Sequence, residues 1–243
     1  MKDKVVLITG GGTGFGQAMA LAFATAGCKV LISGRRAETL RETVAQFEAG
    51  PAGGAMAWIQ ADMSGSEGAS RMVDRALELW GGVDVMINNA GGGIRLAPFD
   101  EYSQEEIGLI LQANLMTAIC GCHAAIPVMK SQRSGVIINV LSVCARYAWP
   151  TWGAYTAAKM GVLGLTRCLY AELRPHGIRV GSLIPGAAAT QFAAAMNMPD
   201  RQDDDRLHAE DVAAAAFLMA SMPERAFVEE LVIWGTDQEV IPR

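Results

Sequence analysis

The sequence predicts an α/β fold, with a single doubly wound domain over residues 1–243. Short apolar runs that suit buried strands alternate along the chain with amphipathic runs at helical spacing. A turn rich in glycine follows the first apolar run, as is common where the first helix of such a fold packs on its sheet. With 243 residues, of which 51% are hydrophobic and 27 are glycine, the chain can bury one large core.

Composition and charge argue against several classes of partner. The formal net charge is -5 and no basic cluster stands out, so we expect no nucleic-acid partner. The first apolar run is too short for a signal peptide, and no stretch offers the roughly 18 consecutive apolar residues of a membrane span. The five cysteines are odd in number and irregularly spaced, which favours free thiols, no metal site and a cytoplasmic location.

The glycine turn predicts a nucleotide site. Residues 4–9 have the pattern of a buried strand, and an amphipathic run at 17–26 follows the turn. Gly10, Gly14 and Gly16 fit the spacing Gly-x-x-x-Gly-x-Gly. Such a turn lets the backbone approach a pyrophosphate, and the following helix offers unpaired N–H groups at its N-terminus. A glycine turn can also be purely structural, but its place directly after the first strand favours nucleotide binding.

The end of the second strand, at 29–33, favours NADP. An acidic residue there would bind the ribose 2′-hydroxyl of NAD, whereas an arginine suits the 2′-phosphate of NADP. The acid is missing, and Arg35 and Arg36 follow Gly34. The alternative is that both arginines face solvent at the start of the next helix, at 37–48.

Asp62 and Met63 follow the third strand, at 55–60. The Asp62 carboxylate could accept a hydrogen bond from the amino group of an adenine. It could equally cap the next helix, at 67–80, together with Ser64 or Ser66. Both alternatives stay open at this point.

Tyr155 and Lys159 are four residues apart in a predicted helix, so their side chains share one face, one turn apart. An ammonium beside a phenol favours the phenolate, and we therefore expect the pKa of Tyr155 to fall below its usual value of about 10. A phenol tuned in this way can transfer a proton near neutral pH. The spacing is a weak signal by itself, because any helix can carry it by chance.

Further motifs follow the glycine turn in a fixed order. They are Thr9-Gly-x-x-x-Gly-x-Gly16, Asn88-Asn-Ala-Gly91 after a strand at 83–87, Asn114 within a helix at 104–131, Ser142 after a strand at 135–141, Tyr155-x-x-x-Lys159, Pro185-Gly186 after a strand at 178–184, and Thr190. Together they resemble the motifs of the short-chain dehydrogenase/reductase family over residues 4–190. Thr13 departs from the pattern, because many NADP-using relatives carry a basic residue there; this keeps NAD open as the alternative cofactor. Ala188 stands where the family usually has Val or Ile.

The resemblance implies a Rossmann-type parallel sheet of about seven strands in the order 3-2-1-4-5-6-7, and NADP-dependent interconversion of a ketone or aldehyde and an alcohol. It implies that Ser142 binds the substrate oxygen and that Tyr155 is the acid and base. It also implies that Lys159 binds the nicotinamide ribose and that Asn114 holds a water relay. A dinucleotide-binding sensor without turnover is the alternative from another class. The implied cofactor contacts are Gly10, Gly14, Phe15, Gly16, Arg35, Arg36, Asp62, Met63, Asn89, Ala90, Gly91, Tyr155, Lys159, Pro185, Gly186 and Thr190.

Aromatic residues between Ser142 and Tyr155 predict an apolar substrate surface, although they could instead be core or subunit contacts. A segment at about 187–208 would form a short lid over the substrate. The apolar faces of the two long helices, with Leu163, Leu165 and Leu169 on the second, would by the same resemblance pair in a homodimer or homotetramer. The candidate substrate contacts are Arg95, Tyr147, Trp149, Trp152 and Phe192, and Arg95 could pair with a carboxylate or phosphate.

Overall fold

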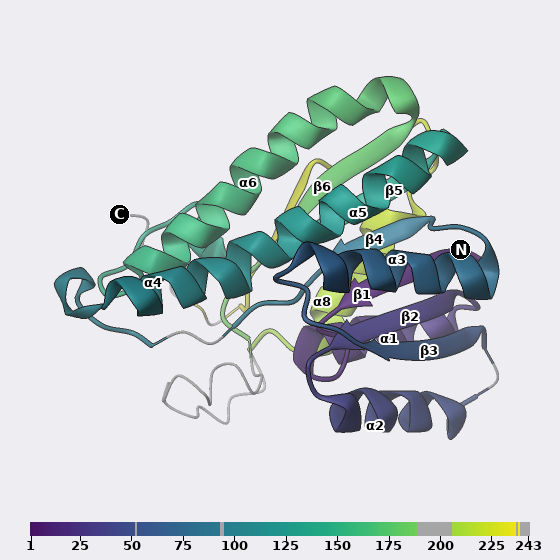
Figure 1. The fold of residues 1–243 in the computed structure, drawn as a ribbon, viewed down its shortest axis with the longest axis horizontal. Helices are drawn as coiled ribbons and strands as arrows, with labels where there is room; N and C mark the ends of the chain where they lie inside the picture. Colours follow the sequence, from purple (N-terminus) through teal and green to yellow (C-terminus); the bar gives the residue numbers. More distant parts are fainter. Residues whose placement is uncertain (52, 93–94, 189–205, 237, 239–243) are drawn as a thin grey trace.

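The computed structural model describes residues 1–51, 53–92, 95–188, 206–236 and 238. Its centre is one parallel sheet of seven strands in the order β3-β2-β1-β4-β5-β6-β7, so the predicted Rossmann-type topology is confirmed (Figure 1). The strands are β1 Val5–Thr9, β2 Lys29–Gly34, β3 Ala55–Gln60, β4 Val85–Asn88, β5 Gly135–Val140, β6 Ile178–Pro185 and β7 Glu230–Ile233.

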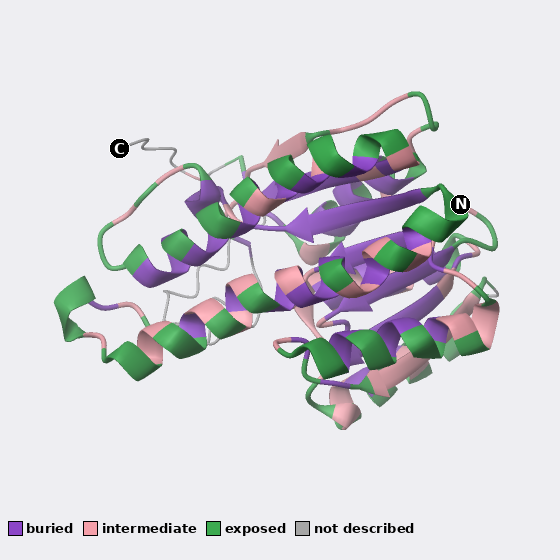
Figure 2. Cartoon of the chain, turned by 45° about the horizontal axis from the view of Figure 1, so that its top comes forward, coloured by how far each residue is buried: buried purple, intermediate pink, exposed green. Residues whose placement is uncertain are grey.

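Helices cover both faces of the sheet, as a parallel sheet requires. One core cluster joins α1, α2 and α8 to the face that carries Val6 and Ile8, and a second joins α3, α5 and α6 to the face that carries Val5 and Leu7. Figure 2 shows buried strands between helices whose outer faces are exposed. The helices are α1 Gly14–Thr25, α2 Ala37–Glu48, α3 Ser66–Trp80, α4 Gln104–Leu111, α5 Thr117–Gln132, α6 Gly153–Leu173 and α8 Ala209–Ser221, with short turns at η1 Phe99–Glu101, η2 Gln112–Met116, η3 Val143–Ala145 and η4 Arg174–His176.

Several predicted boundaries shift where side chains intervene. The fourth strand begins at Val85 and not at 83, because the Gln132 side chain takes both backbone groups of Val83, donating to its O at 2.8 Å and accepting from its N at 2.9 Å. Helix α1 starts inside the glycine turn, at Gly14, three residues before its predicted start. A π-helical turn, Gln112–Met116, interrupts the long helix predicted at 104–131.

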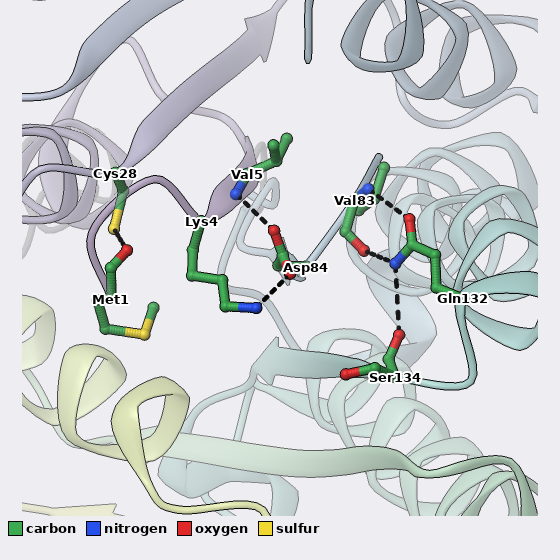
Figure 3. A network of polar contacts seen from close by, with 8 residues as sticks. All are labelled: Met1, Lys4, Val5, Cys28, Val83, Asp84, Gln132 and Ser134. Carbon is green, nitrogen blue, oxygen red and sulfur yellow. Dashed lines mark hydrogen bonds and ion pairs between the residues drawn. The ribbon is translucent and has the colours of Figure 1, made fainter. Parts of the chain in front are cut away.

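The amino ends of the strands are tied together by side chains (Figure 3). The Asp84 carboxylate accepts hydrogen bonds from the backbone N of Val5 at 2.8 Å and from Nζ of Lys4 at 2.7 Å. Gln132 fixes Val83 in the same region. These contacts fix the amino ends of β1 and β4, at the opposite end of the sheet from the carboxyl ends of the strands.

The helical stretch Gln104–Gln132 is long and apolar enough to cross a membrane by length and composition alone. In the structure 44% of its apolar window is buried, and Cys122, Ala125 and Met129 belong to the core against the sheet. Core helices of globular domains pass the same test, and we interpret this stretch as one of them.

The apolar faces expected between subunits are partly used within the chain. Leu163 and Leu169 lie in the chain's own core clusters and not on an open face. The exposed apolar side chains on the two long helices are instead Leu109, Met116 and Met160. Assembly into a homodimer or homotetramer stays a prediction.

Candidate active site

A cavity of about 1270 Å³ runs along the carboxyl ends of the strands. Its wall includes the end of β2, the loops after β1 and β4, and the ends of β5 and β6. The strand order reverses between β1 and β4, which is where doubly wound sheets bind their ligands. The volume exceeds the roughly 300–1,000 Å³ of most small-molecule pockets, so a dinucleotide and a second molecule fit together.

The glycine turn forms one wall of this cavity. Gly10 and Gly14 have φ of 69° and 55°, a region that glycine adopts without strain. A Cβ at Gly16 would lie 2.1 Å from the carbonyl oxygen of Gly10, so helix α1 could not pack this closely with any other residue there. Gly10, Gly14 and Phe15 line the cavity, whereas Gly16 lies behind the wall and serves packing. The first-turn N–H groups of α1 lack partners within the helix, which suits a pyrophosphate.

Two arginines line the cavity at the end of β2. Arg35 and Arg36 are both exposed, and neither has a recorded ion pair among the residues that the structure describes. Their backbone is held in place, because Gln60 Nε2 donates to the Arg35 O at 2.8 Å and Thr39 Oγ1 donates to the Arg36 O at 3.1 Å. Two cations beside a strand end without a carboxylate fit a phosphate group.

Asp62 closes a local turn. Its Oδ1 accepts from the N of Ser64 at 2.9 Å and from Oγ of Ser64 at 2.8 Å, and these bonds, with the nearby Arg35 charge, lower the pKa of the carboxyl. Helix α3 takes Gly65 as its N-cap, so Asp62 does not cap it as one alternative expected. Asp62 and Met63 both line the cavity, which leaves the adenine contact as the open alternative.

The loop after β4 is fixed by two threonines. Thr9 Oγ1 accepts from the N of Asn89 at 2.9 Å and from the N of Ala90 at 2.8 Å. Thr117 Oγ1 donates to the Ala90 O at 3.1 Å from the opposite side. These bonds hold Asn89, Ala90 and Gly91 in the cavity wall, directly beside the glycine turn.

The predicted catalytic side chains converge on the other half of the cavity. Ser142 follows β5 and caps the short helix η3, where its Oγ accepts from the N of Cys144 at 3.2 Å. Tyr155 and Lys159 lie one turn apart on α6 and are 7% and 5% exposed. Lys159 Nζ lies 5.6 Å from the centre of the Tyr155 ring and donates to the Val140 O at 3.2 Å. All three side chains line the cavity.

Burial dominates the electrostatics of this group. It raises the pKa of Tyr155 far above its usual value, although a hydrogen bond with Ser142 acts in the opposite direction. Burial also lowers the pKa of Lys159 to about 8. The expectation of a depressed Tyr155 pKa is therefore wrong for this structure, because desolvation by burial is the largest effect on the phenol and disfavours its charged form. The lysine is the group whose charge changes closest to neutral pH.

Asn114 lies in the π-helical turn, a distortion often found at functional sites. Its Oδ1 accepts from the N of Gly92 at 2.9 Å, and its Nδ2 donates to the carbonyl oxygens of Gly92 and Ile110, both at 3.0 Å. A Cβ at Gly91 would come within 2.9 Å of this Oδ1 and 3.6 Å of Lys159 Nζ. Asn114 thus fixes the backbone that follows β4 close to Lys159, and its part in a water relay stays a prediction.

The substrate candidates divide into two groups. Trp149 and Trp152 line the cavity, and the Trp152 ring meets that of Tyr155 edge-on, with centres 5.7 Å apart. Tyr147 is not part of the wall, because it packs between Trp149 and Trp234. Arg95 also lies outside the cavity wall, where it pairs with Glu106 at 3.0 Å. Neither Tyr147 nor Arg95 therefore lines the cavity, and their roles as substrate contacts stay predictions.

Two predicted site residues, Thr190 and Phe192, lie outside the described residues, as does most of the lid predicted at 187–208. Among the described residues, no group of three or more His, Cys, Asp or Glu side chains could hold a metal ion. Several wall residues were not expected, because they come from distant parts of the chain without a motif of their own. These are Thr39, Leu109, Gln112, Thr117 and Gln238, whereas Cys144 follows Ser142 by two residues and Arg206 belongs to the predicted lid.

Comparisons with known proteins agree with this geometry. The family model described as short chain dehydrogenase matches residues 4–201. The 3beta-hydroxysteroid dehydrogenase 1 of Eggerthella lenta is 39% identical over 91% of this chain and 88% of its own, and an uncharacterised oxidoreductase of Staphylococcus aureus is 29% identical over 96% and 97%.

Solved structures are similar over almost the whole chain. An alcohol dehydrogenase from Thermococcus sibiricus, complexed with 5-hydroxy-NADP, has a TM-score of 0.89 at 26% identity, covering 99% of this chain and 100% of its own. The 3-ketoacyl-(acyl-carrier-protein) reductase from Brucella melitensis, complexed with NADH, has a TM-score of 0.88 at 31% identity, covering 97% and 98%. The chain therefore belongs to the short-chain dehydrogenase/reductase family and is an oxidoreductase of that type.

Proposed function

We propose that the protein interconverts a ketone or aldehyde and an alcohol with NADP(H), and that Tyr155 is the acid and base. The observation that carries the proposal is the convergence of Ser142, Tyr155 and Lys159 on the cavity that the glycine turn also lines. A protein that only binds a dinucleotide needs the glycine turn but has no use for a buried lysine beside a buried phenol. The convergence therefore favours turnover over the sensor alternative.

The chain's own side chains bind the carbonyl oxygen of the substrate and transfer one proton to or from it. A bound nicotinamide supplies the hydride chemistry. Because Ser142 Oγ accepts from the N of Cys144, its hydroxyl hydrogen can donate to the carbonyl oxygen of a substrate. In the reducing direction Tyr155 gives its phenolic proton to that oxygen, and in the oxidising direction it takes the proton back. The nearby Lys159 ammonium stabilises the phenolate left behind.

NADP is the proposed cofactor because Arg35 and Arg36 line the wall directly after β2, and no acidic residue stands at the end of that strand. Among structural relatives, the Thermococcus sibiricus alcohol dehydrogenase is complexed with 5-hydroxy-NADP, and a metagenomic short-chain oxidoreductase is complexed with NADP. The Brucella melitensis relative is complexed with NADH, so both cofactors occur on this fold. The two exposed cations are the feature of this chain that favours the phosphorylated form.

The proposed substrate is a neutral, apolar ketone or secondary alcohol with a ring system. Trp149, Trp152 and Leu109 give the wall beside Tyr155 a largely apolar surface, and flat aromatic faces suit alicyclic rings. The relative from Eggerthella lenta carries the name of a hydroxysteroid dehydrogenase, which supports steroids as the first compounds to assay.

A panel assay tests this proposal. Hydroxysteroids and oxosteroids, small ketones, 3-oxoacyl thioesters and sugars are offered with NADPH and with NADH, and the absorption of the reduced nicotinamide is followed. We expect turnover of apolar ring ketones, with NADPH preferred over NADH. Tight binding of NADPH without turnover of any carbonyl compound would instead support the sensor alternative.

A further inference from the structure

Gln238 reaches the cavity from the far end of the chain. It follows β7 after a tight turn, in which its backbone N donates to the Gly235 O at 3.1 Å. Its side chain belongs to the cavity wall, beside Pro185, Gly186 and Ala187. No motif in the sequence marks this residue, and the family model ends well before it, at residue 201.

The Gln238 side chain accepts a hydrogen bond from the backbone directly after β6. The N of Gly186 donates to the Ile233 O at 2.8 Å, and the N of Ala187 then donates to Oε1 of Gln238, also at 2.8 Å. A Cβ at Gly186 would lie 2.3 Å from the same Oε1 and 3.2 Å from Cε3 of Trp234. The Gln238 side chain is thus packed directly against the glycine of the Pro185-Gly186 motif.

The bond to Ala187 fixes which way the Gln238 amide faces. Because Oε1 accepts from a backbone N–H, the two hydrogens of Nε2 remain as donors. No hydrogen bond from this Nε2 is recorded to any described residue. A held amide in a cavity wall, with its donors unused by the described residues, suits a ligand that offers a carbonyl oxygen.

The position of Gln238 says which end of the cavity such a ligand occupies. Strand β6 pairs with β5, the strand that leads to Ser142, whereas Arg35 and Arg36 follow β2. Strands β1, β4 and β5 lie between β2 and β6. At about 4.8 Å per strand, the two ends are separated by roughly 19 Å along the sheet. Gln238 therefore lies at the end where the reaction takes place.

We propose that Gln238 is a ligand-binding residue, whose Nε2 donates a hydrogen bond to a carbonyl oxygen bound beside Gly186 and Ala187. Two molecules at this end carry such an oxygen: the carboxamide of a nicotinamide and the carbonyl substrate. The inference rests on the proposed function in taking the cavity as the dinucleotide and substrate site. It adds a specific donor from the C-terminal segment to that site.

Two variants separate the donor from the packing role. Gln238→Glu keeps an oxygen that can accept from the N of Ala187 but removes the N–H donors, whereas Gln238→Met removes both and keeps the approximate length. Gln46→Glu, on the exposed side of α2 and outside the cavity wall, adds the same charge as a control. The dissociation constant of NADPH is measured by its fluorescence, and the KM of the carbonyl substrate is measured at saturating NADPH.

We expect both Gln238 variants to weaken one ligand about five- to tenfold, as for loss of one hydrogen bond, while the control stays at the wild-type value. A weaker NADPH complex with an unchanged substrate KM would identify the carboxamide as the partner. A raised KM with an unchanged NADPH constant would identify the substrate. Values within twofold of wild type in both measurements for Gln238→Glu would overturn the inference while leaving the proposed function intact. A wild-type protein that binds neither NADPH nor NADH would overturn both.

Discussion

The depressed pKa of Lys159 predicts how the reaction depends on pH. The ammonium is the form that stabilises the Tyr155 phenolate, and burial lowers the pKa of Lys159 from 10.5 to about 8. Lysine is charged below its pKa, so carbonyl reduction should be independent of pH below about 8 and should fall as pH rises beyond it. At pH 9, about a tenth of the lysines keep their proton, whereas nearly all would at the ordinary pKa.

The pH dependence is measured as kcat/KM for reduction by NADPH between pH 6 and 10, with the fold monitored by circular dichroism. We expect a loss of about tenfold for each pH unit above 8. Lys159→Arg, whose guanidinium keeps its charge throughout this range, should remove the alkaline limb even if its overall rate is lower. Lys130→Ala, an exposed position on α5, should leave the profile unchanged. A wild-type profile that stays flat to pH 10 would refute the assignment.

Three further predictions concern the cofactor, the substrate and the fold. Arg35→Ala should weaken NADPH about tenfold or more while NADH changes little, because only NADPH offers a phosphate to the lost charge; equal losses in a fluorescence titration would reject this role. Trp152→Ala should raise the KM of an apolar ketone about tenfold with little change in NADPH binding, since it removes the apolar wall beside Tyr155; a KM within twofold of wild type would argue against substrate contact. Gln132→Ala should lower the free energy of unfolding, measured in urea, by about 1–2 kcal/mol, because it removes both side-chain hydrogen bonds to the backbone of Val83. NADPH binding should stay unchanged, because Val83 lies at the amino end of β4, away from the cavity.

The main elements could be predicted because they depend on local pattern, whereas the strand order was implied by the family resemblance. The helix at 37–48 and the strand at 55–60 match the structure residue for residue. Each has a clear period and ends at turn residues, so local sequence determines its limits.

The site was predictable only where a motif carried it. Ser142, Tyr155 and Lys159 lie together as their motif implied, but their proton affinities depend on burial that the spacing does not reveal. Arg95 lies outside the cavity wall, where its guanidinium donates to Glu106, eleven residues later, and the sequence pattern gives no sign of this contact.

Other wall residues depend on contacts between distant parts of the chain. Gln238 reaches the cavity through a bond to Ala187, fifty-one positions earlier in the sequence, and Leu109 reaches it from helix α4. Such tertiary contacts cannot be predicted from local sequence patterns, so the place of these two residues in the cavity wall is seen only in the folded chain.

The central claim, that Tyr155 transfers the proton, is tested most directly by Tyr155→Phe. The substitution removes one oxygen from a buried ring and keeps the edge contact with Trp152. The account predicts that kcat for carbonyl reduction falls by at least about 10²-fold while the dissociation constant of NADPH stays within twofold of wild type. A variant that reduces the carbonyl substrate at a rate near that of the wild type would contradict it.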